Sequence, residues 1–228
     1  MDKIAIKDAA TIILIRDRDT NPRILMGQRG SKAAFMPNKY VFPGGAIENA
    51  DHDVPLGAPL DDLTSLRLAE ESARPPSAIA IAAIRELHEE TGQILGTSAP
   101  WHTPPTGWET FAQLGLRPDA SNLQFIFRAI TPAGAPRRFD ARFFMADANG
   151  LSTDPDDFSN AEDELSHLHW VPLTEVRALD LPFITEVVLA EVTAHLKQDN
   201  APDTVPFFRN ENMAHSVTQI TGKPPLGD

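Results

Sequence analysis

Two short stretches, VFPGG at 41–45 and RELHEETG at 85–92, decide how this chain of 228 residues folds. The first is a short apolar strand that runs into the pair Gly44–Gly45, where the bare backbone allows a ligand to approach closely. The second ends a predicted helix at 77–91, which Gly92 terminates as a C-cap. Acidic residues near the negative end of a helix dipole are unfavourable unless another group offsets their charge.

Three carboxylates lie on one side of this predicted helix. Glu86 and Glu90 are four residues apart and Glu89 follows Glu86 by three, so their side chains project from the same side. Mg²⁺ and Mn²⁺ prefer carboxylate oxygens and would offset the repulsion. A solvated acidic helix end is the alternative interpretation, but the glycine pair upstream favours a metal site. The opposite side, predicted to pack on a sheet, carries Ala80, Ile81, Ile84, Leu87 and Thr91.

The remaining elements follow from apolar alternation and turn residues. Strands are expected at 10–16, 23–29, 38–43, 123–130, 138–145 and 165–171, and further helices at 59–71, 174–179 and 184–197. In the helix at 59–71, Leu60, Leu63 and Leu66 are spaced to share one face. Residues 97–107 are predicted to be a loop, and the Pro-rich tail after Asp199 shows little periodicity. Strands around a central helix in this order predict a mixed α/β layered fold.

Composition narrows the classes of protein that fit. The net charge is −12, the pI is about 4.9, and the absence of cysteine excludes disulfides, thiolate nucleophiles and sulfur-ligated metals. An acidic chain is a poor partner for nucleic acid or an anionic membrane. The longest wholly apolar run, residues 78–84, is far shorter than the roughly 20 residues of a membrane span. Because no apolar leader opens the chain, we expect it to be cytoplasmic.

The charge is distributed unevenly along the chain. Three acidic blocks, at 51–76, 85–90 and 154–164, carry the whole net charge, and two basic blocks lie at 23–39 and 128–142. Solvated surface explains most such clusters. Bound divalent ions would nevertheless turn an acidic cleft into a site for phosphate. The basic residues are Arg23, Arg29, Lys32 and Lys39 in one block and Arg128, Arg137, Arg138 and Arg142 in the other.

Together, the two stretches resemble the signature of the Nudix hydrolases, G-x5-E-x7-R-E-U-x-E-E-x-G-U, in which U is a bulky apolar residue. Gly45 matches the first glycine, and the run from Arg85 to Gly92 matches the second half. Asp51 replaces the expected glutamate, and 33 residues rather than seven separate it from Arg85. An insert, about residues 52–76, therefore splits the signature, and closing a long surface loop costs little entropy.

A signature split in this way is similar to that of the branch that includes a peroxisomal coenzyme A diphosphatase of animals. Besides Asp51, three positions depart from the family patterns. Ala34 and Asn38 stand where the commoner coenzyme A-cleaving members have Arg and Gly, and Gln93 stands where the signature closes with an apolar residue. Other stretches similar to the branch are AFMPNKYVFPGG at 34–45, RRFDARFF at 137–144 and LPFITEVVL at 181–189.

The resemblance, which spans about residues 8–197, implies a Nudix-type α/β/α sandwich with a mixed sheet. It implies Mg²⁺- or Mn²⁺-dependent attack of water on the pyrophosphate bond of a small nucleotide-derived diphosphate, with coenzyme A or acyl-coenzyme A as candidate substrates. The chain is interpreted as one domain, 1–228. Its insert and its tail, 199–228, are available to pack on a second copy in a homodimer.

The resemblance also implies roles for particular residues. The implied metal ligands are Gly44, Glu86, Glu89, Glu90 and Glu164, and the implied catalytic residues are Arg85, Glu86, Glu89 and Glu164. Relatives take a further acid from a later loop, for which Glu164 is preferred to Glu162 as metal ligand or general base. Arg85 is implied to orient a glutamate, with Glu89 as the partner that the spacing allows, and Asp51 is given a supporting role.

The substrate pocket is expected to be formed by loops and the insert. Basic side chains at strand ends could bind the phosphates, although exposed bases are common in such positions. The candidates for substrate binding are Arg29, Lys32, Lys39 and Arg142.

Other conspicuous residues have simpler interpretations. Aromatic residues in strand patterns are predicted to belong to the core rather than to stack on a base, and these are Phe42, Phe143, Phe144 and Trp170. His167 and His169 alternate on a strand, but two histidines without a third ligand do not predict zinc.

Two other classes of function fit less well. A Nudix-like module that senses a nucleotide without cleaving it commonly lacks a glutamate of the signature, whereas Glu86, Glu89 and Glu90 are all present. Isopentenyl diphosphate isomerase shares the fold, but its relatives use a catalytic cysteine, which this chain does not have. ADP-ribose, NADH and dinucleoside polyphosphates fit the same hydrolytic chemistry as coenzyme A.

Overall fold

The computed structural model describes residues 4–197, 202–211 and 214–223. The described residues form a mixed sheet in the order β11-β10-β7-β8-β1-β2-β3, with β4 paired to β1 and β9 paired to β2. β1 runs parallel to β8 and antiparallel to β2 and β4. A separate pair, β5 and β6, lies outside this sheet. The strands are β1 (Ile6–Arg16), β2 (Arg23–Arg29), β3 (Tyr40–Val41), β4 (Gly44–Ala46), β5 (Gly96–Ser98), β6 (Leu116–Pro118), β7 (Gln124–Ile130), β8 (Arg138–Asp147), β9 (Leu165–Pro172), β10 (Val205–Glu211) and β11 (Ala214–Ile220).

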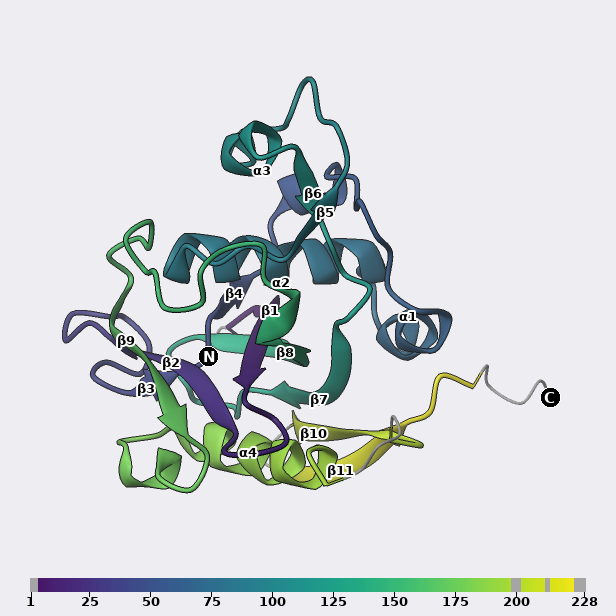
Figure 1. Ribbon diagram of the computed structural model, residues 1–228. Coiled ribbons are helices and arrows are strands. Elements are labelled where there is room, and N and C mark those ends of the chain that lie inside the picture. Colours follow the sequence, from purple (N-terminus) through teal and green to yellow (C-terminus); the bar gives the residue numbers. More distant parts are fainter. Residues whose placement is uncertain (1–3, 198–201, 212–213, 224–228) are drawn as a thin grey trace.

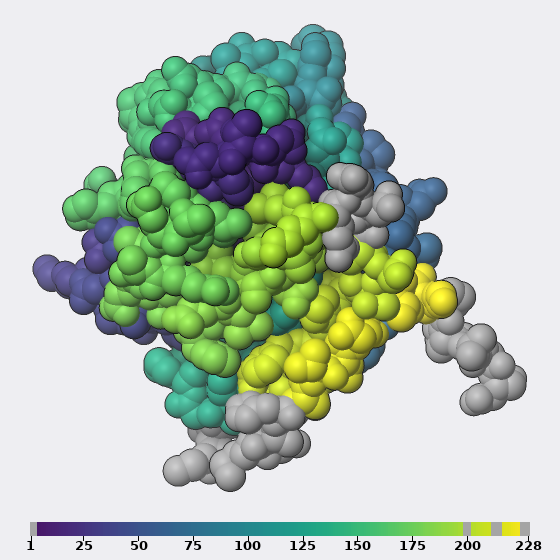
Figure 2. All heavy atoms as spheres, turned by 60° about the horizontal axis from the view of Figure 1, so that its bottom comes forward, coloured from purple at the N-terminus to yellow at the C-terminus, as the bar shows by residue number. Residues whose placement is uncertain are grey.

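Helices cover both faces of this sheet (Figure 1). α2 (Pro76–Thr91) packs on one face, and α4 (Phe183–His195) packs on the other, beside the β10–β11 hairpin (Figure 2). The arrangement confirms the predicted α/β/α sandwich with a mixed sheet. The other helices are α1 (Asp62–Ala69), α3 (Glu109–Gln113) and the short 3-10 helices Asn49–His52, Ala148–Gly150 and Val176–Ala178. No helix of the described chain is long and apolar enough to cross a membrane.

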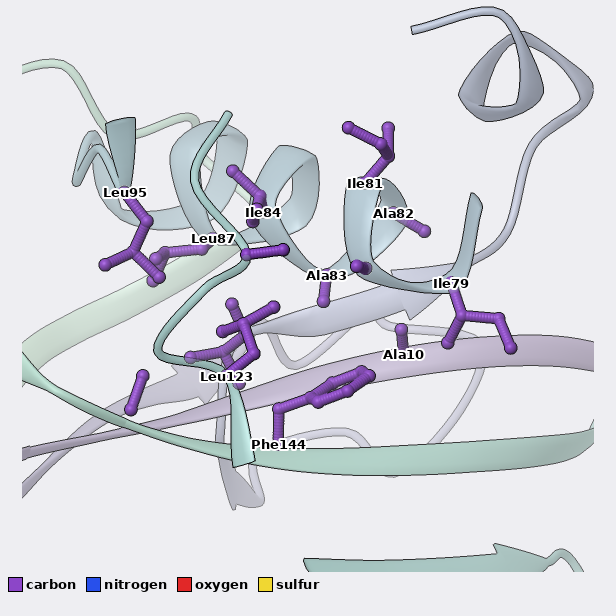
Figure 3. Packing of buried hydrophobic residues seen from close by; sticks show 14 of the residues in the cluster. Ala10, Ile79, Ile81, Ala82, Ala83, Ile84, Leu87, Leu95, Leu123 and Phe144 are labelled. Carbon is purple, nitrogen blue, oxygen red and sulfur yellow. The ribbon is translucent and has the colours of Figure 1, made fainter. Parts of the chain in front are cut away.

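α2 is the central helix of the core, and residues 78–84 are fully buried. It ends at Gly92, whose φ of 73° lies in the left-handed region, as the sequence predicts. Ile79 points towards the sheet, where Phe144 lies, whereas Ile81 points to the opposite side (Figure 3). The prediction that Ile81 faces the sheet is therefore wrong. The side of α2 away from the sheet is also buried, because distant segments, including Phe111 of α3, belong to the same core cluster.

Several predictions of secondary structure are wrong. Leu63 and Leu66 are exposed, so α1 does not bury the face that leucine spacing indicates. The tail after Asp199 forms β10 and β11, because β10 finds a partner in β7, far away in sequence. The segment 174–179 contains a 3-10 helix rather than an α-helix, and β5, β6 and α3 were not expected. Residues 199–201, 212–213 and 224–228 of the tail lie outside the described part of the chain.

The insert is fastened to the sheet by Arg128 of β7. Its guanidinium donates to the carbonyl oxygens of Glu70 and Glu71 at 3.1 and 2.9 Å, and pairs with Asp140 at 2.7 Å. These bonds satisfy backbone carbonyls where α1 ends, at a point where the chain turns towards α2. The insert is therefore an ordered part of the fold.

Arg142 of β8 forms a second buried link and is 1% exposed. It donates to Asp8 at 2.6 Å, to the backbone carbonyl of Asp140 at 2.7 Å and to the hydroxyl of Ser72 at 3.2 Å. Burial would raise the pKa of Asp8, but the hydrogen bonds and charges of Arg142 and Arg74 outweigh it and hold the pKa below its usual value. Asp8 therefore remains a carboxylate and balances the charge of Arg142.

The insert and the tail also pack on each other. Arg67 of α1 donates to the backbone carbonyls of Pro202 and Asp203, each at 2.7 Å. Glu70 accepts a hydrogen bond from the backbone N–H of Thr221 at 3.0 Å. The contact thus lies within one chain, and the homodimer stays a prediction.

Removing the Arg142 side chain should destabilise the fold. Arg142→Ala leaves Asp8 without its closest cation, so we expect the free energy of unfolding to fall by about 3 kcal/mol. Urea unfolding followed by circular dichroism measures this change. The exposed Arg177 serves as the control, since Arg177→Ala should change stability by less than about 0.5 kcal/mol. Equal stability of the two variants would contradict the structural role of Arg142.

Candidate metal and substrate site

The two halves of the split signature meet at the C-terminal end of α2. The Gly44 N–H donates to the Glu90 carboxylate at 2.8 Å, and an added Cβ at Gly45 would overlap the carboxylate of Glu86. An added Cβ at Gly44 would lie 2.5 Å from the carbonyl oxygen of Ala10. Both glycines belong to β4, which pairs with β1. Close approach, rather than a turn, therefore requires glycine at these positions.

Arg85 connects α2 to the segment that precedes the insert. Its guanidinium donates to Asp51 at 2.9 Å, to Glu86 at 2.9 Å, to Glu89 at 2.8 Å and to the carbonyl of Ala46 at 2.9 Å. Burial would lower the pKa of Arg85, but the hydrogen bond to Asp51 and the charges of Glu86 and Asp51 raise it. Asp51 is itself buried. The residue at the position of the expected glutamate thus pairs with Arg85 across the insert.

Glu86 and Glu90 are poorly compensated carboxylates. Burial raises the pKa of Glu86 to about 7 although Arg85 lies against it. Burial also raises the pKa of Glu90 well above its usual value, the Gly44 N–H offsets only part of this rise, and the charges of Glu86 and Glu164 add to it. Both carboxyl groups would be stabilised as anions by a nearby cation.

These residues fit a divalent cation. Mg²⁺ and Mn²⁺ take oxygen ligands, and Glu86 and Glu90 offer buried carboxylates whose pKa values are raised. Arg85 binds Glu86 but shares its guanidinium with Asp51 and Glu89, and Arg29 binds Glu164. Within the described residues, no three Asp, Glu or His side chains already converge as a formed metal site. Glu86 and Glu90, beside Gly44, are therefore the residues best placed to hold an ion.

Gln93 anchors the loop that leads to Glu164. Its buried side-chain amide donates to the carbonyls of Asp154 and Asp157 at 3.1 and 2.9 Å. The backbone N–H of Glu162 adds a hydrogen bond to α2, on the Glu89 carbonyl, at 2.8 Å. Gln93 stands where the signature has an apolar residue. Its amide explains this difference, because an apolar side chain could not donate hydrogen bonds to these carbonyls.

A cleft of about 1030 Å³ opens beside these groups on the face of the sheet that α4 partly covers. α4 packs on the C-terminal half of β1, at Ile13 and Ile15, and leaves the N-terminal half open. Phe183, the first residue of α4, lines the cleft and is 71% exposed. No residue of the insert 52–76 lines it, so the expectation that the insert forms the pocket is wrong. The end next to α2 is lined by Arg29, Gly44, Gly45, Glu86 and Glu164.

The predicted substrate-binding residues lie in different places. Arg29 lines the cleft and donates to Glu164 at 3.1 Å. Lys39 pairs with Asp180 and, like the exposed Lys32, does not belong to the lining. The structure thus brings one of these three bases into the cleft.

Arg142 does not line the cleft either. Side chains alternate along β8, and Ala141 and Phe143 face the cleft, so Arg142 faces the opposite side and meets Asp8. Its predicted contact with substrate is therefore corrected to a structural ion pair.

The predicted core aromatics are all buried, as expected, namely Phe42, Phe143, Phe144 and Trp170. Phe42 and Phe143 also line the cleft, so the expectation that these two do not stack on a base stays a prediction. His167 and His169 are exposed on β9, and no described cluster around them could hold a metal.

Three bases at the far end of the cleft were not predicted as site residues. Lys7, Arg137 and Arg138 line it, although the sequence marked the two arginines only as members of a basic block. Strand alternation could have indicated Lys7, since it lies two and four residues before Ala9 and Thr11, which face the same cleft. Lys7 lies near Arg137 because β1 pairs with β8, and the sequence does not reveal this pairing.

The mixed sheet between α2 and α4, with the glycine pair against the helix glutamates, defines a Nudix fold. No family model matches the chain. A Caenorhabditis elegans protein assigned as nudix hydrolase 7 is 33% identical over 178 residues, which cover 72% of this chain and 51% of that protein. The chain thus spans about half the length of this curated relative.

Solved structures show the same fold. A Nudix hydrolase from Alicyclobacillus acidocaldarius has a TM-score of 0.62 and 25% identity, covering 87% of this chain and 99% of its own. The NUDIX domain of Shewanella oneidensis NrtR, complexed with ADP-ribose, has a TM-score of 0.50 and 14% identity, covering 84% and 89%. The chain belongs to the Nudix hydrolase superfamily.

Substitution of Gly45 should disturb the carboxylate that lies against it. The new methyl group of Gly45→Ala displaces Glu86, so we expect Mn²⁺ to bind at least about tenfold more weakly, as measured by calorimetric or electron paramagnetic resonance titration. Gly30→Ala is the matched control, because a Cβ there meets no atom within 4 Å. Unchanged Mn²⁺ affinity in Gly45→Ala would show that the ion does not depend on Glu86.

Proposed function

We propose that the chain hydrolyses the pyrophosphate bond of a nucleoside diphosphate linked to another group, with Mg²⁺ or Mn²⁺ as cofactor. The observation that best supports this proposal is the approach of Gly44 and Gly45 to Glu86 and Glu90 at one end of a large cleft. Membership of the Nudix hydrolases supports the class of reaction. The activity of the whole protein is part of the proposal, since the curated relative is about twice as long as the matched region.

Glu86 and Glu90 would hold the cation, with Gly44 beside them and with Glu89 as a further oxygen ligand. The ion supplies positive charge for the pyrophosphate oxygens and favours ionisation of water at neutral pH. The fit rests on the buried and poorly balanced carboxylates of Glu86 and Glu90.

The protein's own groups have distinct roles in this proposal. Glu164 lies at the lining of the cleft with its carboxylate half exposed, and it would accept the proton of the attacking water. Arg29, which donates to Glu164, would also face the negative charge of the diphosphate. Arg85 does not line the cleft and acts by positioning Glu86 and Glu89.

The proposed substrate is a nucleotide-derived diphosphate with a large organic group, and coenzyme A or acyl-coenzyme A is the first candidate. A cleft of about 1030 Å³ with many apolar side chains supports a ligand larger than an isolated diphosphate. ADP-ribose, NADH and dinucleoside polyphosphates are the alternatives. The Shewanella domain complexed with ADP-ribose supports a nucleotide diphosphate ligand in general.

Glu90→Gln should remove the activity without unfolding the protein. The variant keeps the shape of Glu90 but loses a ligand charge, so we expect Mn²⁺-dependent cleavage to fall at least about 100-fold. Stability should not decrease, because burial already disfavours the charged form of Glu90. Initial rates on a panel of the substrates named above, together with unfolding curves, measure both effects. Glu175→Gln, at an exposed position away from the cleft, is the control.

Two results would contradict the proposal. Full activity of Glu90→Gln would show that the cleavage does not use this carboxylate. No cleavage of any substrate on the panel by the parent protein with Mg²⁺ or Mn²⁺, but with measurable binding, would instead support a nucleotide-sensing module.

A further inference from the structure

The lining of the cleft changes sign along its length. The end beside α2 holds Glu86 and Glu164, with Arg29 paired to Glu164, whereas Lys7, Arg137 and Arg138 lie at the far end. Among the described residues, no acidic side chain lines that far end. The net charge of the chain is −12, so a cluster of bases without acids is a specific feature of this place.

Strand pairing brings these bases together. β1 and β8 are parallel, with Ile6 opposite Arg138 and Lys7 opposite Phe139. Because side chains alternate, Lys7 and Phe139 point to the cleft face. Arg137 lies in the bend that precedes β8, next to Arg138, and lines the same cleft. Lys7 and Arg137 thus belong to the same end of the cleft, where one anion can lie between them.

No carboxylate in the described part of the chain pairs with the three bases. In the described chain, the ion pairs and hydrogen bonds do not include the exposed side chains of Lys7 and Arg137. Arg138 donates to the backbone carbonyls of Thr131 and Asn210, each at 3.0 Å, and neither partner is a carboxylate.

The nearest acids along the strands face the other side of the sheet. Asp8 and Asp140 alternate with the cleft-facing residues and contact Arg142, at 2.6 Å for Asp8 and 3.5 Å for the Asp140 carboxylate. They do not neutralise the bases of the cleft. Among the described residues, no carboxylate neutralises the positive surface that the far end offers to a ligand.

The floor between the two ends is low and apolar. A row of alanines crosses the sheet there, and its small side chains leave room above the strands. The alanines pair in succession across β7, β8, β1 and β4, and they are Ala129, Ala141, Ala9 and Ala46. On β8, Phe139 and Phe143 flank the alanine of this row and also line the cleft. A ligand that occupies the cleft can thus extend from the glycine end to the basic end without meeting a charged side chain in between.

Strand geometry sets the scale of such a ligand. Lys7 precedes Thr11, which is opposite Gly44, by four residues. At a rise of about 3.3 Å per residue, the backbone of Lys7 is about 13 Å from the glycine end. The Lys7 and Arg137 side chains extend into the cleft and shorten the distance between their charges and the diphosphate.

We propose that Lys7 and Arg137 form a second anion site, which binds a phosphomonoester on the organic part of the same substrate. The inference rests on the proposed function, because it places the cleaved diphosphate at the Glu86 end. Lys and Arg form strong charge-assisted hydrogen bonds with phosphate. The site makes the protein select diphosphates that carry this additional phosphate over those that lack it.

Matched substrates test this selectivity. Coenzyme A and 3′-dephospho-coenzyme A differ by one phosphomonoester, as do NADPH and NADH. With Mn²⁺, we expect kcat/KM of the parent to be about tenfold higher for the phosphorylated member of at least one pair, and the Lys7→Gln/Arg137→Gln double variant to bring this ratio close to one. Arg177→Gln, at an exposed position outside the cleft, should keep the parent ratio.

Binding without turnover separates this inference from the proposed function. Calorimetric titration of the four compounds in the absence of metal should show the same preference in the parent and its loss in the double variant, whether or not any compound is cleaved. Unfolding curves establish that the variants are folded. Equal ratios in the parent for both pairs, or a preference that survives in the double variant, would overturn the second anion site.

Discussion

The contact between Arg85 and Asp51 holds together a site whose parts lie far apart in the chain. One guanidinium binds Asp51, the carbonyl of Ala46 and the glutamates Glu86 and Glu89. Closing 33 rather than seven residues costs about 1.4 kcal/mol more in loop entropy. A single hydrogen bond between charged groups contributes about 1.5–3 kcal/mol. The hydrogen bonds of the Arg85 guanidinium can therefore offset the entropy cost of the insert, and β4, which carries Gly44 and Gly45, keeps its position against α2.

The same contact explains why the insert can be elaborate without disturbing the site. Its α1 packs on the tail through Arg67, and its end is held by Arg128. None of its residues lines the cleft. The insert thus adds structure at one edge of the sheet. The residues that line the cleft come from the sheet, from the start of α4, from the segment before β9 and from the loops β2–β3 and β7–β8.

Local patterns in the sequence predicted the parts of the fold that depend on neighbouring residues. β2 has the predicted bounds, and α2 ends where Gly92 requires it to end. Positions that depend on distant partners were predicted less well. The tail forms strands because β10 can pair with the edge of β7. Arg142 forms an ion pair with Asp8 because its position in the alternation of β8 directs its side chain away from the cleft. In the candidate site, spacing indicated the helix glutamates and the Arg85–Glu89 pair, but Gln93 and Lys7 act through contacts that no local pattern contains.

The central claim is that Arg85 and Asp51 assemble a divalent-cation site from the glycine strand and α2. Anomalous X-ray scattering from crystals of the protein soaked in Mn²⁺ tests it most directly, because it locates the ion without any assumption about substrate. The account predicts a manganese peak in contact with the carboxylates of Glu86 and Glu90. A well-ordered Glu86–Glu90 region with no peak at millimolar Mn²⁺, or a manganese ion bound only elsewhere, would contradict it.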